Sequence, residues 1–163
     1  MELQRQPEQA RRAPQIPERP ALAESLVRVV ADTYAIAFQT QSFHWNVRGP
    51  QFAALHRLFE EQYGELTSSV DELAERVRAL GQLAPTSLRE IMNFTTIPLD
   101  HGAPSARAMV EILLQANELV ARGTRHVADL AEQAGDAVTH DMLVARTAAH
   151  EKAAWMLRAT LEE

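Results

Sequence analysis

The sequence of 163 residues contains no cysteine. This absence excludes disulfide bonds, thiolate zinc sites, iron–sulfur clusters and a cysteine nucleophile. It also agrees with a reducing compartment, where disulfides are rare. Long apolar runs are missing too, because no stretch approaches the roughly 20 consecutive apolar residues of a membrane span. The first twenty residues hold no apolar segment of the kind found in secretory signals. We therefore expect a soluble, cytoplasmic protein with no membrane partner.

Lysine is almost absent from the chain. Lys152 is the only lysine among 16 basic residues, and the net charge is −6. Affinity for duplex DNA comes mainly from neutralised phosphates, so an acidic chain is a poor general binder of nucleic acid. Residues 1–20 hold four arginines, three glutamates and four prolines that break helices. We expect this segment to be a flexible tail, and its weak positive charge predicts only weak binding to DNA.

No stretch has the alternating pattern of a strand, and apolar residues recur at helical spacing through most of the chain. Gly49-Pro50 and Gly81 are typical stop signals, and Ser87 with Glu90 has the spacing of a capping box. Four long amphipathic helices, with a short extra helix in the long connection between the second and third, predict an all-α four-helix bundle over residues 21–163. The predicted helices cover about residues 21–45, 55–80, 88–93, 104–135 and 138–160.

The apolar positions of each long helix predict the side that faces the core. In the first two helices the expected inward positions are Leu22, Leu26, Val29, Val30, Thr33 and Ala37, then Leu55, Phe59, Gln62, Leu66, Val70, Leu73, Val77 and Leu80. In the last two they are Met109, Ile112, Ala116, Leu119, Gly123, Val127 and Leu130, then Met142, Ala145, Ala149, Ala153, Met156 and Thr160.

Five of the histidine and carboxylate side chains between residues 44 and 75 are candidate metal ligands. His44 stands near the end of the first helix, and the second helix carries His56 with Glu60 and Asp71 with Glu75, each pair four residues apart. That spacing places both members of a pair on one helix face. Hard and borderline metal ions, iron(II) among them, bind such sets of nitrogen and oxygen ligands. The joint occurrence of these groups predicts a metal site.

A plainer interpretation exists for each pair taken alone. Charged pairs at this spacing are typical of a solvated helix face, and Asp71 and Glu75 would then lie at the solvent edge, next to Arg76 and Arg78. Carboxylates beside an apolar stripe are costly to bury unless they meet a cation or a metal. The metal interpretation therefore depends on all five groups acting together.

Distance decides how such a site is built. Asp71 lies 15 residues beyond His56 on the same predicted helix, which is about 22 Å along the helix axis. One chain therefore cannot close all these groups around one ion. Two copies of the helix packed antiparallel about a two-fold axis would bring the histidine end of one to the acidic end of the other, twice per interface. We expect any shared site to lie between subunits.

Longer motifs resemble a known family. The segment Phe43-His44-Trp45-Asn46-Val47-Arg48-Gly49, His56 and the run at 71–76 are similar to the Dps family, the DNA-binding proteins from starved cells or miniferritins. Residues 135–139 and 150–157 support the resemblance, which covers about residues 21–161.

The resemblance implies a ferritin-like subunit assembled as a hollow homo-dodecamer. It also implies that His44 and His56 of one subunit, with Asp71 and Glu75 of its two-fold mate, form a ferroxidase site. Glu60 stands where the family often has aspartate and would bind the second, weaker iron of a di-iron site. Zinc or manganese are the alternatives to iron at such a site.

The reaction implied by the family is oxidation of iron(II), by hydrogen peroxide in preference to dioxygen, followed by storage of iron(III) mineral and protection of DNA. Trp45 resembles a tryptophan beside the family's site, which takes up stray oxidising equivalents or simply packs. The family lines three-fold pores with acids, for which Glu132, Asp136 and Asp141 are candidates. The alternative is that these acids are ordinary surface groups near helix ends.

Two other functions stay open at this point. One is a DNA-compacting stress protein, associated with the nucleoid, whose iron binding is secondary. The other is a helical stress protein that binds metal without turnover. The remaining histidines have no partner at ligand spacing and are expected to be structural or surface residues: His101, His126, His140 and His150.

Overall fold

The computed structural model describes residues 19–99 and 102–162, so the predicted tail, apart from Arg19 and Pro20, lies outside it, as does His101. Within these ranges the chain forms no strand. None of the helices within these ranges is long and apolar enough to cross a membrane. The helices are α1 (Pro20–Asn46), α2 (Phe52–Ala79), α3 (Leu88–Phe94), α4 (Ala106–Gln133) and α5 (Ala137–Ala159).

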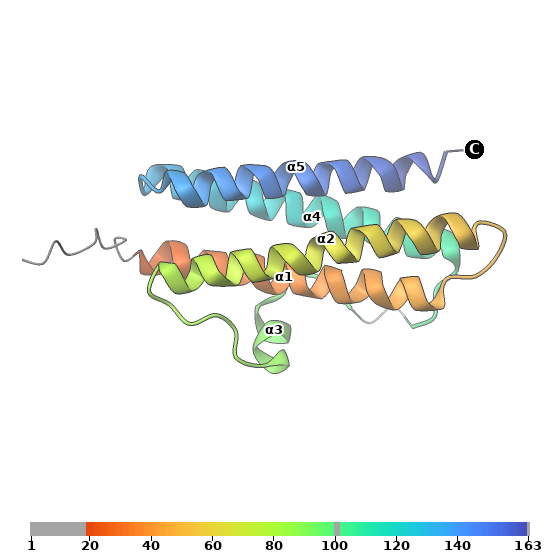
Figure 1. Ribbon diagram of the computed structural model, residues 1–163, viewed down its shortest axis with the longest axis horizontal. Helices are drawn as coiled ribbons and strands as arrows, with labels where there is room; N and C mark the ends of the chain where they lie inside the picture. Colours follow the sequence, from red (N-terminus) through yellow and green to blue (C-terminus); the bar gives the residue numbers. More distant parts are fainter. Residues whose placement is uncertain (1–18, 100–101, 163) are drawn as a thin grey trace, which may run out of the picture.

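The four long helices pack as two antiparallel pairs. Figure 1 shows α1 beside α2 and α4 beside α5, with short turns joining the members of each pair. The segment from α2 to α4 runs the length of the bundle, and α3 lies in this segment on the outside, against α1. The predicted all-α bundle with a short extra helix in a crossover connection is therefore confirmed.

The helix ends follow the local signals in the sequence, with one shift. Pro20 occupies the first turn of α1, where its missing N–H costs nothing. At α3, Ser87 Oγ accepts the N–H of Glu90 at 3.3 Å, as a capping box requires. The Glu90 carboxylate, however, accepts the N–H of Thr86 at 2.7 Å. The return bond of the predicted box is thus displaced by one residue.

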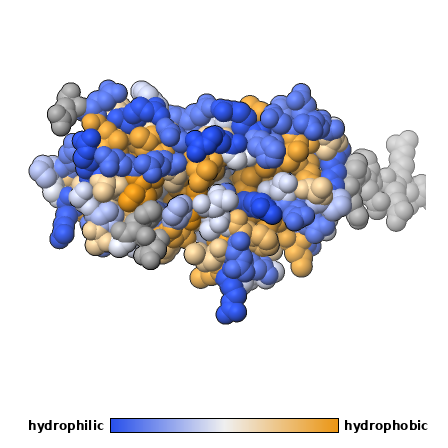
Figure 2. Space-filling model, turned by 180° about the vertical axis from the view of Figure 1, so that it is seen from behind, coloured by the Kyte–Doolittle hydropathy of each residue, from blue (hydrophilic) through white to orange (hydrophobic). Residues whose placement is uncertain are grey.

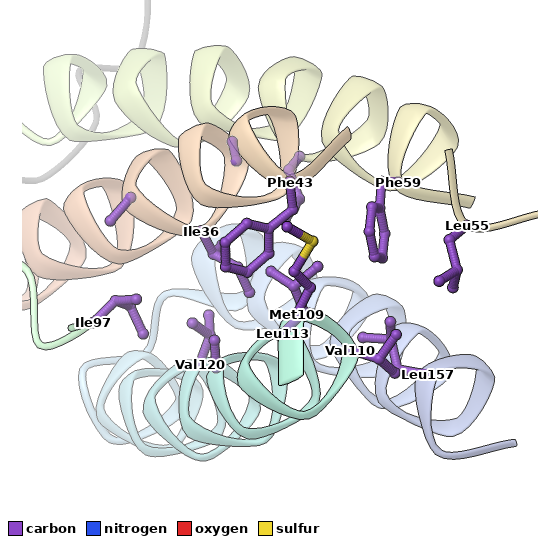
Figure 3. Close-up of a cluster of buried hydrophobic side chains, with 14 of the residues drawn as sticks. Ile36, Phe43, Leu55, Phe59, Ile97, Met109, Val110, Leu113, Val120 and Leu157 are labelled. Atoms are coloured by element: carbon purple, nitrogen blue, oxygen red, sulfur yellow. The ribbon is translucent and has the colours of Figure 1, made fainter. Parts of the chain in front are cut away.

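Two apolar clusters fill the bundle, one toward each end. Figure 3 shows the cluster nearer the α1–α2 turn. Phe59, at its centre, is 0% exposed, and burial of such a ring stabilises the fold by about 2–3 kcal/mol. The labelled members of this cluster are Ile36, Phe43, Leu55, Phe59, Ile97, Met109, Val110, Leu113, Val120 and Leu157. The second cluster includes Leu22, Leu26, Val30, Leu73, Val77, Leu80, Val127, Ala131 and Leu143.

A polar band separates the two clusters. Each long helix turns a small hydroxyl inward there: Thr33, Ser69, Thr124 and Thr147 are all buried. The hydroxyls of Thr124 and Thr147 lie 2.8 Å apart across α4 and α5, and Thr33 donates to the carbonyl of Val29 at 2.7 Å. Because these groups find acceptors inside the bundle, their burial is tolerated.

The inward faces of α1 and α2 agree with the prediction, except that Val70 is only half-buried. The predicted face of α5 is wrong by one residue, and the predicted face of α4 is right only in part. The buried positions in α5 include Leu143, Arg146, His150, Ala154 and Leu157, each one residue after a predicted position. In α4 the predicted Met109, Ala116 and Val127 are buried, whereas Ile112, Leu119 and Leu130 are half-buried and Gly123 is exposed. The buried positions that lie one residue after a predicted one are Val110, Leu113, Asn117, Val120, Thr124, Ala128 and Ala131. Polar residues occupy much of these true faces, so the apolar pattern indicated the neighbouring stripe.

Apolar side chains also reach the surface. Figure 2 shows orange areas between the hydrophilic ones on one broad face of the molecule. On α1, Tyr34, Phe38 and Trp45 are 40%, 52% and 60% exposed. They stand four and seven residues apart, which places them on one side of the helix. We call these three residues the aromatic row of α1.

Candidate metal centre

The turn between α1 and α2 brings His44 and His56 side by side. The N–H of Val47 bonds to the carbonyl of Phe43 at 2.8 Å and closes the last turn of α1. Gly49 then takes a φ of +110°, a conformation that only glycine adopts without strain. Because α2 begins at Phe52, His56 lies in the second turn of α2. This turn is opposite the last turn of α1, which contains His44.

Two reciprocal hydrogen bonds orient the histidine rings. The Nδ1–H of His44 donates to the carbonyl oxygen of His56 at 2.8 Å, and the Nδ1–H of His56 donates to the carbonyl oxygen of His44 at 2.9 Å. A carbonyl oxygen can only accept, so each Nδ1 carries a proton. In a neutral imidazole the proton on Nδ1 leaves Nε2 with a free lone pair. Both rings are thus prepared as metal ligands through Nε2.

Aromatic contacts hold the pair in place. The rings of His44 and His56 stack with centroids 3.7 Å apart and planes at 20°. Tyr63 meets His44 edge-on at 5.3 Å, and Phe52 stacks on His56 at 5.0 Å. The sequence interpretation missed both aromatic neighbours. Their spacing offered a signal, since Phe52 and Tyr63 stand four residues before and seven after His56, on the same side of α2.

The carboxylates of the predicted site lie on the exposed surface of α2. Glu60, one turn after His56, is exposed, and so are Asp71 and Glu75 toward the other end of the helix. In the described part of the chain, no group of three or more histidine and carboxylate side chains is close enough to hold a metal. A single chain therefore does not assemble the predicted set, as the separation along α2 requires.

The two arginines next to these acids in sequence, Arg76 and Arg78, form hydrogen bonds with other groups. Arg76 turns inward and binds both carboxylate oxygens of Asp136, at 2.8 and 2.9 Å. Arg78 donates to the carbonyl oxygen of Gln82 at 2.9 Å. Among the described residues, Asp71 and Glu75 form no ion pair. In the subunit Asp71 and Glu75 lie at the solvent edge, as the plainer interpretation expects, although Arg76 and Arg78 do not pair with them.

Asp136 has a structural role that the sequence interpretation did not foresee. It is 3% exposed, and it caps α5 by accepting the N–H of Thr139 at 3.1 Å. Burial alone would raise the pKa of Asp136, but the hydrogen bonds from Thr139 and Arg76 and the charge of Arg76 outweigh it and lower that pKa. Of the three acids considered for a pore, only Glu132 and Asp141 are exposed. The proposal that Asp136 lines a pore is corrected.

The other histidines divide into surface and interior. His126 is exposed and His140 half-buried. His150 is 1% exposed, and its Nδ1 lies 2.9 Å from Asn117 Oδ1. The expectation of structural or surface roles is met for these three.

Comparison with known proteins assigns the chain to a family. The family described as ferritin-like domain matches residues 23–163. A DNA protection during starvation protein from Brevibacillus brevis is 37% identical over 86% of this chain and 95% of its own length. The crystal structure of Dps from Thermosynechococcus elongatus superposes with a TM-score of 0.86 at 29% identity, covering 88% of this chain and 91% of that one.

The description of a third similar protein names the superfamily to which that protein belongs. The Dps protein of Vibrio cholerae, described as a member of a broad superfamily of ferritin-like diiron-carboxylate proteins, superposes with a TM-score of 0.84 at 26% identity over 92% of this chain and all of its own. The helices, the turn and these matches define a ferritin-like subunit. Within that class, the chain belongs to the Dps family.

Proposed function

We propose that this protein is a ferroxidase and iron store that oxidises iron(II) between its subunits and keeps iron(III) mineral inside a hollow homo-dodecamer. Hydrogen peroxide is the preferred oxidant and dioxygen the slower one. By removing both reagents of radical formation the protein would protect DNA in the cytoplasm, in part at the nucleoid.

The orientation of His44 and His56 is the observation that supports this proposal most. Both Nδ1–H groups are committed to backbone carbonyls, at 2.8 and 2.9 Å, so both Nε2 lone pairs are available for iron(II). Backbone acceptors also fix the ring orientation before iron arrives, which reduces the entropy lost on binding.

The acids would come from a second subunit. Asp71 and Glu75 are exposed and without an ion pair among the described residues. Asp71 lies about 22 Å from His56 along α2, and Glu75 lies one turn further. A two-fold partner with antiparallel α2 helices would bring them to the histidines. The aromatic row of α1, Tyr34, Phe38 and Trp45, offers apolar surface that such a partner would cover.

The chemistry needs two iron(II) ions as substrate. Each loses one electron; peroxide accepts both electrons with two protons, its O–O bond breaks, and two water molecules form without a hydroxyl radical. His44, His56, Asp71 and Glu75 would hold the first ion. Glu60, one turn from His56 and exposed, would complete the position of the second, weaker ion. The same nitrogen-and-oxygen set also suits zinc or manganese, which would compete with iron.

Two neighbouring features would assist the reaction. Trp45 follows His44 directly and is 60% exposed, so it can accept stray oxidising equivalents if the partner holds it near the iron. Glu132 and Asp141 are exposed on either side of the α4–α5 turn. Acids gathered at a symmetry axis raise the local cation concentration, so these two would line the path of iron into the shell. Replacement of both by neutral residues should slow iron uptake, and an unchanged rate would remove them from the path.

The double variant His44→Ala/Asp71→Ala tests the proposal. We expect an intact assembly whose peroxide-driven oxidation of iron(II), followed by stopped-flow absorbance, is at least about a hundredfold slower, because ligands are lost from both contributing subunits. The matched control is His126→Ala/Asp129→Ala, which removes an exposed histidine and an exposed acid from α4. Equal rates in the double variant and the control would refute the assignment.

DNA compaction is the second candidate, favoured by the name of the Brevibacillus relative, a DNA protection during starvation protein. The charge of −6 argues for weak binding at physiological salt, although many tails on one shell would add avidity. A gel shift at low and moderate salt, with and without residues 1–20, distinguishes the two functions. Strong binding at moderate salt that depends on those residues would make compaction the primary role.

A further inference from the structure

A pocket of about 290 Å³ opens between α2 and α5, away from the histidine pair. The apolar part of its wall comes from Leu58 and Leu66 on α2 and from Ala149, Ala153 and Met156 on α5. For scale, an apolar cavity of about 150 Å³ is large enough to bind benzene. This pocket therefore has room for a small organic molecule with one ring.

Two buried polar side chains line the pocket, and their polar groups are only partly satisfied. Gln62 is 9% exposed, and within the described residues neither its amide nitrogen nor its amide oxygen has a hydrogen-bond partner. His150 is 1% exposed, and its Nε2 has no partner among the same residues. A buried polar group without a partner costs about 1–3 kcal/mol. Such a cost is tolerated where a ligand supplies the missing bonds.

The protonation state of His150 determines which hydrogen-bonding group its Nε2 can bind. Asn117 donates its amide N–H to the carbonyl of Leu113 at 2.8 Å, which leaves Asn117 Oδ1 to accept the Nδ1–H of His150 at 2.9 Å. Burial, reinforced by the charge of Arg146 and opposed by Glu65, lowers the pKa of His150 to about 4. The ring is neutral at physiological pH, so Nε2 is an acceptor that requires an O–H or N–H donor.

Charges around the pocket favour neither a cation nor an anion. Glu65 lines it, but both carboxylate oxygens of Glu65 are bound by Arg146. The other two charged lining residues, Glu61 and Lys152, are of opposite sign and exposed. A charged ligand would lose its hydration without a net countercharge, which is costly. A neutral ligand avoids this cost.

We propose that this pocket binds a compact, neutral, mostly apolar molecule carrying one hydroxyl, of the class of simple phenols. The hydroxyl donates to Nε2 of His150 and accepts from the amide of Gln62, while the ring packs on Leu58, Leu66 and Met156. The site is separate from iron oxidation and needs none of the residues assigned to it.

The test is ligand-observed NMR titration of the assembled, full-length protein with phenol and, separately, with toluene. The two probes have similar shapes, but only phenol can bond to His150 and Gln62. Since one good hydrogen bond contributes about 1 kcal/mol, phenol should bind at least fivefold more tightly. Equal binding of the two probes, or no saturable binding of phenol, would overturn the proposal without any need for a variant.

Two variants locate the site. Ala153→Leu fills the pocket wall and should weaken phenol binding about tenfold, whereas Ala145→Leu, an exposed position of α5 outside the pocket, should leave it unchanged. Gln62→Leu should reduce the preference for phenol over toluene about fivefold, because one of the two hydrogen bonds is lost, and it should leave the melting temperature unchanged or higher, because it removes an unsatisfied amide. Phenol binding that is undiminished in Ala153→Leu, or a preference that is undiminished in Gln62→Leu, would place the binding elsewhere.

Discussion

The two ends of α2 carry the two halves of the proposed iron site, and they are built differently. At the first end, His56 is fixed by hydrogen bonds and ring stacking to His44 within the same chain. At the other end, Asp71 and Glu75 are exposed and without an ion pair among the described residues. The first end is organised within the subunit, whereas the second would be organised only by the partner subunit of the proposed site.

This difference teaches how a shared site can stay inactive until subunits meet. Neutral imidazoles can be partly buried at modest cost once their N–H groups are bonded, so they can be preorganised in the single chain. Carboxylates remain hydrated until a partner and a cation are present. On the inner side of α2, a carboxylate is buried for a structural purpose. There Asp136 is neutralised by its ion pair with Arg76.

The largest expected effect is on the free energy of unfolding, and it concerns the two arginines at the acidic end of α2. Arg76→Met would leave the Asp136 carboxylate buried without its main partner, and we expect a loss of about 3–5 kcal/mol in the free energy of unfolding. Arg78→Met, on the exposed side of the same turn, should change it by less than about 0.5 kcal/mol. Urea denaturation measures both. A similar small loss for both variants would contradict the structural role of Arg76.

The next effect should appear in activity and not in stability. Asp71→Asn/Glu75→Gln should slow iron(II) oxidation about a hundredfold, equivalent to about 2.7 kcal/mol in the activation barrier. Because neither acid has an ion pair among the described residues, the monomer fold should not depend on them. Glu72→Gln, an exposed neighbour on α2, is the control. A variant that unfolds more easily would show that these acids are structural after all.

At the histidine end, activity and stability should change together. His44→Ala removes a ring stacked on His56 and one hydrogen bond at 2.8 Å, and we expect a loss of about 1–2 kcal/mol in the free energy of unfolding. Trp45→Ala, the exposed neighbour, should cost much less in the isolated subunit. Thermal unfolding of both variants checks this, and equal costs would mean that the ring pair is not preorganised.

The smallest effect on activity concerns the turn that places the two histidines. Gly49→Ala puts a side chain at a φ of +110°, which should cost about 1–2 kcal/mol. The oxidation rate should fall only a few-fold, because the turn would adjust and shift the rings slightly. Thermal unfolding and stopped-flow absorbance on the same sample measure both effects. A fully active variant of undiminished stability would show that the turn does not set the geometry.

The fold could be predicted largely from the sequence, because capping residues, glycines and apolar periodicity act locally. The bounds of α1 and α3 agree with prediction to within one residue. The inward face of α5 and part of that of α4 could not be predicted, since Asn117, Thr124 and His150 are polar and yet buried. Their burial depends on hydrogen bonds between helices that are distant in sequence, such as His150 with Asn117.

The candidate residues of the site also followed from the sequence, but their geometry did not. The pairing of His44 with His56 depends on the path of the backbone through the turn, which sets both carbonyl acceptors. The inward turn of Asp136 depends on Arg76, 60 residues away in sequence. Spacing alone could not distinguish that buried acid from the exposed Glu132 and Asp141.

Subunit complementation tests the central claim most directly. One variant, His44→Ala/His56→Ala, keeps its acids, and the other, Asp71→Asn/Glu75→Gln, keeps its histidines; each alone should be nearly inactive. When the two are co-refolded in equal amounts, half of the two-fold interfaces are mixed, and each mixed interface contains one intact site of two.

The measurement is the rate of iron(II) oxidation by the co-refolded mixture. If histidines of one subunit act with acids of the next, about a quarter of the wild-type rate should return. A mixture no more active than its two parents would contradict a site shared between subunits.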